Sequence, residues 1–113
     1  MLNELDVLFR LMMAFVLGGI IGLEREVRGK EAGFKTNTLV CVGAALFMII
    51  SIRVYEIYHL TAPVDPSRIA SQVVTGIGFL GGGAIIRFRE GIKGLTTAAG
   101  IWAASGIGLA CGL

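Results

Sequence analysis

Charged residues are scarce in this sequence of 113 residues: Asp, Glu, Lys and Arg make up 16% of it, against about 25% in ordinary globular proteins. Hydrophobic residues make up 55%. A soluble domain of this size needs more charge to cover its surface, so the composition favours a single transmembrane domain, residues 1–113. The net charge of +2 is too small to indicate a nucleic acid as partner.

Cysteine and histidine are also rare, which argues against a metal centre and against an enzyme. Cys41 and Cys111 lie in apolar stretches without metal-ligand spacing, and we interpret them as small buried hydrophobic residues. His59 is the only histidine. The sequence holds no nucleophile–base constellation and no G-x-x-x-x-G-K-[ST] phosphate loop. We therefore expect no catalytic residue, no metal ligand set and no cofactor.

Glycine, by contrast, is abundant, and Gly76–Gly81 fits the G-x-G-x-x-G pattern of dinucleotide-binding loops. That reading needs a strand before the motif, a soluble helix after it and an acidic residue about twenty positions later. Glu90 is the only acidic residue that follows, and it comes too early. The motif also lies within a long apolar run, so we interpret it as part of a membrane helix.

Four runs without charge predict the fold. The run 69–86 would be about 27 Å long as a helix, close to the ~30 Å hydrocarbon core of a bilayer. The first run is shorter, and it spans if Arg10 extends its charge to the nearer surface, eased by a helical pair with Asp6. We predict an all-α, polytopic membrane helical bundle with four transmembrane helices, at about residues 5–23, 36–55, 66–86 and 96–113.

Local sequence indicates where these helices begin. Asp65 followed by Pro66 is typical of an N-cap and a first helical residue. We expect the other two internal starts to be capped by threonine or asparagine side chains, at Thr36 or Asn37 and at Thr96 or Thr97.

Basic residues predict the orientation, because they gather in cytoplasmic loops. The connections after the first and third helices are the more basic, which predicts that both chain ends lie outside the cytoplasm. The residues on the expected inner side are Arg25, Arg28, Lys30, Lys35, Arg87, Arg89 and Lys93, and those on the outer side are Arg10, Arg53 and Arg68.

Glycines lower the stability of a helix, so some other interaction must offset this loss. The five within Gly76–Gly83 cost about 4–5 kcal/mol relative to alanine. Close helix packing is one explanation, since three G-x-x-x-G pairs occur. The alternative is a broken helix whose exposed carbonyls line an ion path. The three packing pairs are Gly18 with Gly22, Gly78 with Gly82, and Gly108 with Gly112.

The sequence resembles the membrane domain of the MgtC/SapB family. Three runs carry the resemblance: GGIIGLEREVRGKEAGFKTNTLVCVGAALF at 18–47, DPSRIASQVVTGIGFLGGGAII at 65–86 and GLTTAAGIWAASGIGLACG at 94–112. The resemblance covers about residues 5–113. It implies a bacterial inner-membrane protein linked to growth in low magnesium and to virulence, with a fifth membrane helix beyond the last residue. The ending at Leu113 without a charged anchor agrees with a shortened chain.

The resemblance further implies a regulator that acts on other membrane proteins, and the family's name does not by itself establish transport. One departure concerns Lys35, where many members carry arginine. Lysine presents a point charge in place of a bidentate fork, which puts in doubt any role that needs two-pronged carboxylate or phosphate contact.

The positions of the polar residues bear on magnesium. Magnesium prefers carboxylate and water ligands, yet the carboxylates lie at helix ends rather than within the expected spans, so a carboxylate-lined pore is not supported. A hydrated ion passing hydroxyls and carbonyls stays open as an alternative. The candidate functional residues are Glu24, Arg25, Glu26, Lys35, Thr36, Arg68, Gln72, Thr75, Thr96 and Thr97.

Glu24 and its neighbours form the main polar group at one helix end. They are either a docking or sensing site, or a structural terminus in which Glu24 pairs with Lys35 or Arg87. Two functions follow. One is a non-enzymatic regulator that binds other membrane proteins, and the other is a magnesium or other cation transporter formed at an oligomer interface. The expected partners are the lipid bilayer, a second copy of the chain as at least a dimer, and other membrane proteins.

Overall fold

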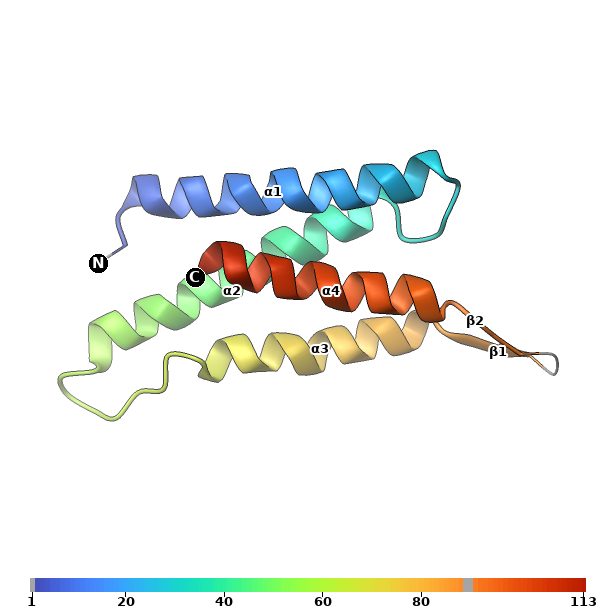
Figure 1. Cartoon of the computed structure of the whole chain (residues 1–113). Helices are drawn as coiled ribbons and strands as arrows, with labels where there is room; N and C mark the ends of the chain where they lie inside the picture. The colour runs from blue at the N-terminus through green and yellow to red at the C-terminus, as the bar shows by residue number, and fades with distance from the viewer. Residues whose placement is uncertain (1, 89–90) are drawn as a thin grey trace.

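The computed structural model describes residues 2–88 and 91–113, and its described part consists of four helices and one short hairpin (Figure 1). Of the predicted basic residues, Arg89 lies outside the described residues. The elements in chain order are α1 (Glu4–Val27), α2 (Phe34–Tyr58), α3 (Arg68–Ala84), β1 (Ile86–Phe88), β2 (Gly91–Lys93) and α4 (Leu95–Gly112).

The helices form a thin bundle. α1 packs along α2, α2 crosses behind α4, and α3 runs antiparallel beside α4 (Figure 1). The bundle extends 56 × 27 × 14 Å along its principal axes. Because its smallest dimension is close to the ~10–12 Å width of a single helix, each helix keeps a side that no other part of the described chain covers.

α1 begins with a capping box. The Oδ1 atom of Asn3 accepts a hydrogen bond from the backbone of Asp6 at 2.8 Å, and the Asp6 carboxylate accepts one from the backbone of Asn3. The expected pairing of Asp6 with Arg10 is therefore wrong. Arg10 instead donates from Nη1 to the carbonyl of Gly112 at 2.6 Å, so it ties α1 to the end of α4.

The predicted caps of α2 and α4 are wrong, because both helices begin earlier, after a glycine. Gly33 is the N-cap of α2 and Gly94 that of α4, and neither helix has a side-chain cap. Gly94 has a φ of 95°, which only glycine adopts without strain, so the turn out of the hairpin fixes where α4 begins. Asn37 lies one turn inside α2.

The third helix begins and ends inside its predicted bounds of 66–86. Asp65 accepts hydrogen bonds from the backbone and the hydroxyl of Ser67, at 2.9 and 2.7 Å, so it stabilises a turn that precedes α3. After Ala84 the chain forms an antiparallel hairpin in which Ile86 faces Lys93. The sequence predicts only a basic connection here, although β-branched isoleucines favour extended backbone.

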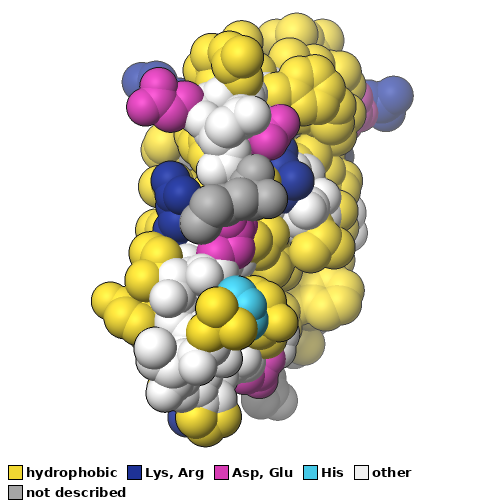
Figure 2. All heavy atoms as spheres, turned by 90° about the vertical axis from the view of Figure 1, so that its left-hand side faces the viewer, with side chains coloured by type: hydrophobic (Ala, Val, Ile, Leu, Met, Phe, Trp, Pro, Cys, Tyr) yellow, Lys and Arg dark blue, Asp and Glu magenta, His cyan; other side chains and the backbone are white. Residues whose placement is uncertain are grey.

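Three of the described helices, α1, α2 and α4, are long and apolar enough to cross a membrane. α3 is shorter, with 17 residues. Large hydrophobic side chains cover the outside: Phe9 is 64% exposed, Phe79 84% and Trp102 59%. Figure 2, which views the bundle from the left-hand side of Figure 1, shows several charged side chains on this end and hydrophobic side chains over much of the rest of the surface in view. A surface of this kind matches a lipid surrounding rather than water.

The interior is made of small residues. Ala14, Cys41 and Ala45 are completely buried where α1 and α2 meet. On α4, Gly108 and Gly112 lie against the α2 backbone. Small residues let helix backbones approach closely, which is how membrane helices gain packing contacts without a hydrophobic driving force.

The three G-x-x-x-G pairs fall into two groups. Gly18 and Gly22 face α2, where an added Cβ would lie 2.6 Å from the Cys41 Cβ and 2.6 Å from the Phe34 Cα, and the α4 pair is similarly enclosed. Gly78 and Gly82 on α3 differ, because an added Cβ would meet no atom of the described chain within 4 Å. This third pair packs against nothing in the described part of the chain.

Candidate functional site

Arg25 connects three parts of the chain at the end where the α1–α2 connection lies. It comes from the last turn of α1, and its Nη2 donates to the carbonyl of Glu31 at 3.0 Å and to the Thr97 hydroxyl at 2.5 Å. Thr97 is buried in the first turn of α4. Two residues predicted as candidates on separate grounds thus meet, and we call Arg25, the Glu31 carbonyl and Thr97 the Arg25 cluster.

Glu24 does not pair with Lys35 as expected. Its Oε1 lies 2.5 Å from the Nε of Arg28, one turn further along α1, and both side chains are more than half exposed. An exposed pair of this kind contributes little to stability. The other expected partner, Arg87, has a side chain outside the described part of the structure.

Glu26, the last residue of the Glu24–Glu26 group, faces the connection between α1 and α2. A Cβ added to Gly33 would lie 3.0 Å from the Glu26 Oε1, so the carboxylate covers the backbone just before α2. Lys35 and Thr36 are exposed in the first turn of α2. Neither carries a side-chain hydrogen bond in the described residues, so the structure does not bring them into the Arg25 cluster.

Two buried polar residues, Asn37 and Thr38, were not predicted as site residues. Asn37 is 2% and Thr38 7% exposed. The Asn37 Nδ2 donates to the carbonyls of Ala32 and Gly33, at 2.5 and 3.2 Å, which fixes a turn where Ala32 has a φ of 54°. The Asn37 Oδ1 and the Thr38 Oγ1 have no partner in the described structure. Adjacent polar residues followed by an apolar run were the signal that could have found them.

The remaining candidates do not converge. Gln72 and Thr75 are exposed in the first half of α3, whereas Thr96 and Thr97 begin α4. Because Ala98 packs at Gly81, the start of α4 lies beside the end of α3, about 13 Å along the helix from Gln72. These four residues therefore form no single cluster.

The broken-helix interpretation of the glycine run is wrong. α3 is one continuous α-helix from Arg68 to Ala84, through all the glycines between Gly76 and Gly83. The carbonyls up to Leu80 accept hydrogen bonds within this helix, so they are not free to line a path for ions. The described residues also contain no group of three or more His, Cys, Asp or Glu side chains that could hold a metal ion.

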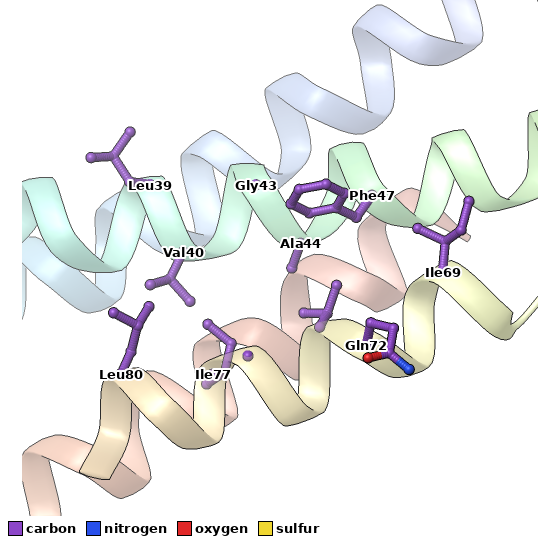
Figure 3. Close-up of a pocket in the computed structure, with 11 residues that line it drawn as sticks. Leu39, Val40, Gly43, Ala44, Phe47, Ile69, Gln72, Ile77 and Leu80 are labelled. Atoms are coloured by element: carbon purple, nitrogen blue, oxygen red, sulfur yellow. The ribbon is translucent and has the colours of Figure 1, made fainter. Parts of the chain in front are cut away.

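A groove of about 470 Å³ lies between α2 and α3 (Figure 3). Its walls run from Leu39 to Phe47 on α2 and from Ile69 to Leu80 on α3. Gln72 is the only polar side chain among the lining residues. Figure 3 shows Gln72 at the same end as Ile69 and Phe47, with Leu39 and Leu80 at the other end.

At the Gln72 end of the groove, Arg68 is exposed in the first turn of α3. The nearby carboxylate of Asp65 receives two hydrogen bonds from Ser67, which hold the pKa of Asp65 below its ordinary value, and the charge of Arg68 lowers this pKa further. No carboxylate of the described chain lies within ion-pairing distance of Arg68. Its guanidinium is thus available to an external anion.

An apolar exterior, an interior of small residues and charges gathered at the ends together define a helical membrane protein. The comparison with known families agrees: residues 11–113 match the MgtC family. The chain belongs to the MgtC family, so the resemblance found in its sequence is confirmed.

The relatives share nearly half of their aligned residues with this chain. It is 47% identical over 111 residues to “Putative magnesium transporter YhiD” of Escherichia coli, covering 95% of this chain and 51% of the relative. It is 46% identical over 106 residues to “Protein MgtC” of Salmonella typhimurium, covering 94% and 43%. The chain thus spans about half the length of the curated relatives it matches. None of these names denotes an enzyme, and no solved structure matches.

Proposed function

We propose that this protein is a multi-pass protein of the bacterial inner membrane, with four membrane-spanning helices and its N-terminus outside. It acts in magnesium homeostasis and in adaptation to low magnesium, including virulence, by binding and regulating other membrane proteins. The printed name of one relative, “Putative magnesium transporter YhiD”, and membership of the MgtC family support the link to magnesium. The basic residues at one end support the orientation.

One observation carries the choice of a regulator over a transporter: the charged residues lie toward the ends of the described helices, and the interior between them is closely packed with small residues. The buried hydroxyls there, of Ser51 and Ser105, donate to backbone carbonyls. Ala14, Cys41 and Ala45 are fully buried at the centre of the bundle, and α3 is unbroken. Between these ends, the described helices present no carboxylate that could replace the water shell of an ion.

Magnesium flux into liposomes tests this choice. Purified protein would be reconstituted around a magnesium-sensitive dye, with insertion checked by protease protection. The proposal expects no flux above that of protein-free liposomes. Protein-dependent flux that is lost on Gln72→Ala with Thr75→Ala would contradict it and favour a transporter.

The open face of α3 supports self-association. Ser71, Thr75, Gly78 and Gly82 follow one another at helical spacing and are all exposed, and the two glycines have open space beside them. We call these four residues the α3 small-residue face. Small-xxx-small faces let membrane helices of two copies approach closely, so we propose that two copies of the chain associate here.

Energy transfer between labelled copies in liposomes tests this association. Gly78→Leu is expected to weaken it about tenfold, an effect of about 1.4 kcal/mol. Gly100→Leu is the matched control, because Gly100 also has open space beside it but lies on α4. Equal effects of the two substitutions would contradict the assignment to α3.

A further inference from the structure

The groove between α2 and α3 has hydrophobic walls, and a cationic residue lies at one of its ends. From Ile69 to Leu80 it follows α3 for about 16 Å, roughly half of the ~30 Å hydrocarbon core. Its length thus matches one leaflet of a bilayer. Arg68 is the first residue of α3 and directly precedes Ile69, which lies at the same end of the groove as Gln72 and Phe47.

The groove is kept open by two glycines that face it from opposite helices. Gly43 on α2 and Gly76 on α3 both line it, and an added Cβ at either would meet nothing within 4 Å. Neither glycine is needed for contact between the helices of this chain. Their effect is to leave room for something else between α2 and α3.

The size of the groove decides what can enter. A volume of about 470 Å³ falls within the roughly 300–1,000 Å³ of sites that hold one small amphiphilic molecule. A helix about 10–12 Å wide with its side chains occupies on the order of 1,000 Å³ over the length of the groove, which is more than the groove holds. A hydrocarbon chain is narrow and has no polar groups to satisfy, so it suits walls in which Gln72 alone is polar.

The charge at the rim selects the headgroup. Arg68 is exposed and has no ion-pair partner in the described chain, and Gln72 lies one helical turn deeper. A phospholipid presents these groups in the same order: phosphate at the surface, ester oxygens next, and then the tail. The Arg68 guanidinium matches the phosphate, the Gln72 amide can donate to an ester carbonyl, and the groove receives the tail.

We infer that the α2–α3 groove is a binding site for an anionic phospholipid of one leaflet, with Arg68 at its phosphate, Gln72 at its ester and one acyl chain in the groove. This inference rests on the membrane insertion of α2 and α3 proposed above. It adds a lipid-recognition site to a protein whose other proposed partners are proteins.

Native mass spectrometry of detergent-purified protein tests the inference, with phosphatidylglycerol and phosphatidylcholine titrated separately. The unchanged chain is expected to bind one phosphatidylglycerol more tightly than phosphatidylcholine. Gly76→Leu fills the groove and is expected to weaken binding of both lipids about tenfold. Arg68→Gln is expected to remove only the preference for phosphatidylglycerol, about fivefold for one basic residue near a charged headgroup. Gly100→Leu is expected to change neither.

A second measurement places the tail. In a Trp102→Phe background, Phe47→Trp puts the only tryptophan at the rim of the groove, and phosphatidylglycerol with brominated tails should quench it more than brominated phosphatidylcholine does.

Three results would overturn the inference. The first is lipid binding that Gly76→Leu leaves unchanged, and the second is a preference for phosphatidylglycerol that Arg68→Gln leaves unchanged. The third is an oligomer that Gly76→Leu dissociates while lipid binding stays the same, which would make a second copy the occupant. Protease protection of the same samples reports insertion separately, so failure of the lipid site is distinguishable from failure of the proposed membrane topology.

Discussion

The same glycine motif occurs in two environments in this protein. On α1 and α4, the pairs Gly18–Gly22 and Gly108–Gly112 bring two helices against α2. On α3, Gly78 and Gly82 face open space, although the motif there is identical and the glycine content higher. The motif in the sequence therefore does not show by itself whether its glycines contact another helix of the same chain.

The two regions also differ in how firmly their helices are packed. α2 is packed against both α1 and α4, and Arg10 and Arg25 link the two ends of α1 to α4. α3 buries only Ala70, Ile77 and Gly81, and it meets α2 across the open groove. We expect substitutions in the first region to change folding, and those in the second to change binding.

The largest effect is expected where a side chain would enter the α2 backbone. Gly108→Ala places a methyl group against the Cys41 carbonyl and the Ala44 Cβ, and backbone cannot move aside cheaply. We predict a loss of about 3 kcal/mol in the free energy of unfolding, at the upper end of overpacking costs. Unfolding in mixed micelles by titration with sodium dodecyl sulfate measures it. A loss below about 0.5 kcal/mol would show that α4 does not pack on α2 as described.

Arg25 should matter next. Arg25→Ala removes charged hydrogen bonds to Thr97 and to the Glu31 carbonyl, and it leaves a buried hydroxyl without this donor. The predicted loss is about 2 kcal/mol, as for hydrogen bonds that involve a charged group. Arg28→Ala is the matched control on the same helix, with an exposed partner and an expected change within about 0.5 kcal/mol. Equal losses of stability for the two variants would contradict the claim that the Arg25 cluster stabilises the fold.

The sign of the effect should reverse on α3. Gly83→Ala adds a methyl group in open space within a continuous helix, so only the helix propensity changes. We predict a gain of about 0.5–1 kcal/mol in the free energy of unfolding, measured by the same titration as Gly108→Ala. A loss at Gly83 would mean that this part of α3 is packed against something within the chain.

Much of the fold could be predicted from the sequence, because uncharged runs fix where apolar helices lie. The starts of α2 and α4 could not, since the turns at Gly33 and Gly94 decide them rather than the threonines that follow. The hairpin after Ala84 was missed because its first residue, Ile86, continues an apolar run, and the charged residues that follow indicate a loop. Periodicity alone does not tell a short strand from the end of a helix.

The sequence predicted which residues belong to the candidate site better than it predicted how they are arranged. Arg25 and Thr97 were both named, yet their contact joins helices that are distant in the sequence, and only the packing of α1 on α4 brings them together. Asn37 was interpreted as a cap because the sequence does not show which residues surround it. Its burial depends on those residues. The two environments of the glycines are hidden for the same reason.

The smallest effect concerns the turn before α3. Hydrogen bonds from Ser67 hold the pKa of Asp65 below its ordinary value of 3.8. Because the folded pKa is depressed, the stabilisation by this turn is present above that ordinary value and is lost as the pH falls through the folded pKa. Ser67→Ala should raise the pKa of Asp65, as followed by NMR titration of its carboxyl carbon. Ser71→Ala, whose hydroxyl bonds to the Arg68 carbonyl instead, should leave it unchanged.

Cysteine crosslinking along α3 tests the comparison most directly. In a Cys41→Ala, Cys111→Ala background, single cysteines would replace each residue of the α3 small-residue face and, in turn, the inward-facing Ala70, Ile77 and Gly81. After oxidation in native membranes, we predict disulfide-linked dimers for the outward set and none for the inward set. Crosslinking that is equal in the two sets, or absent from both, would contradict the claim that α3 turns its glycines toward a second copy.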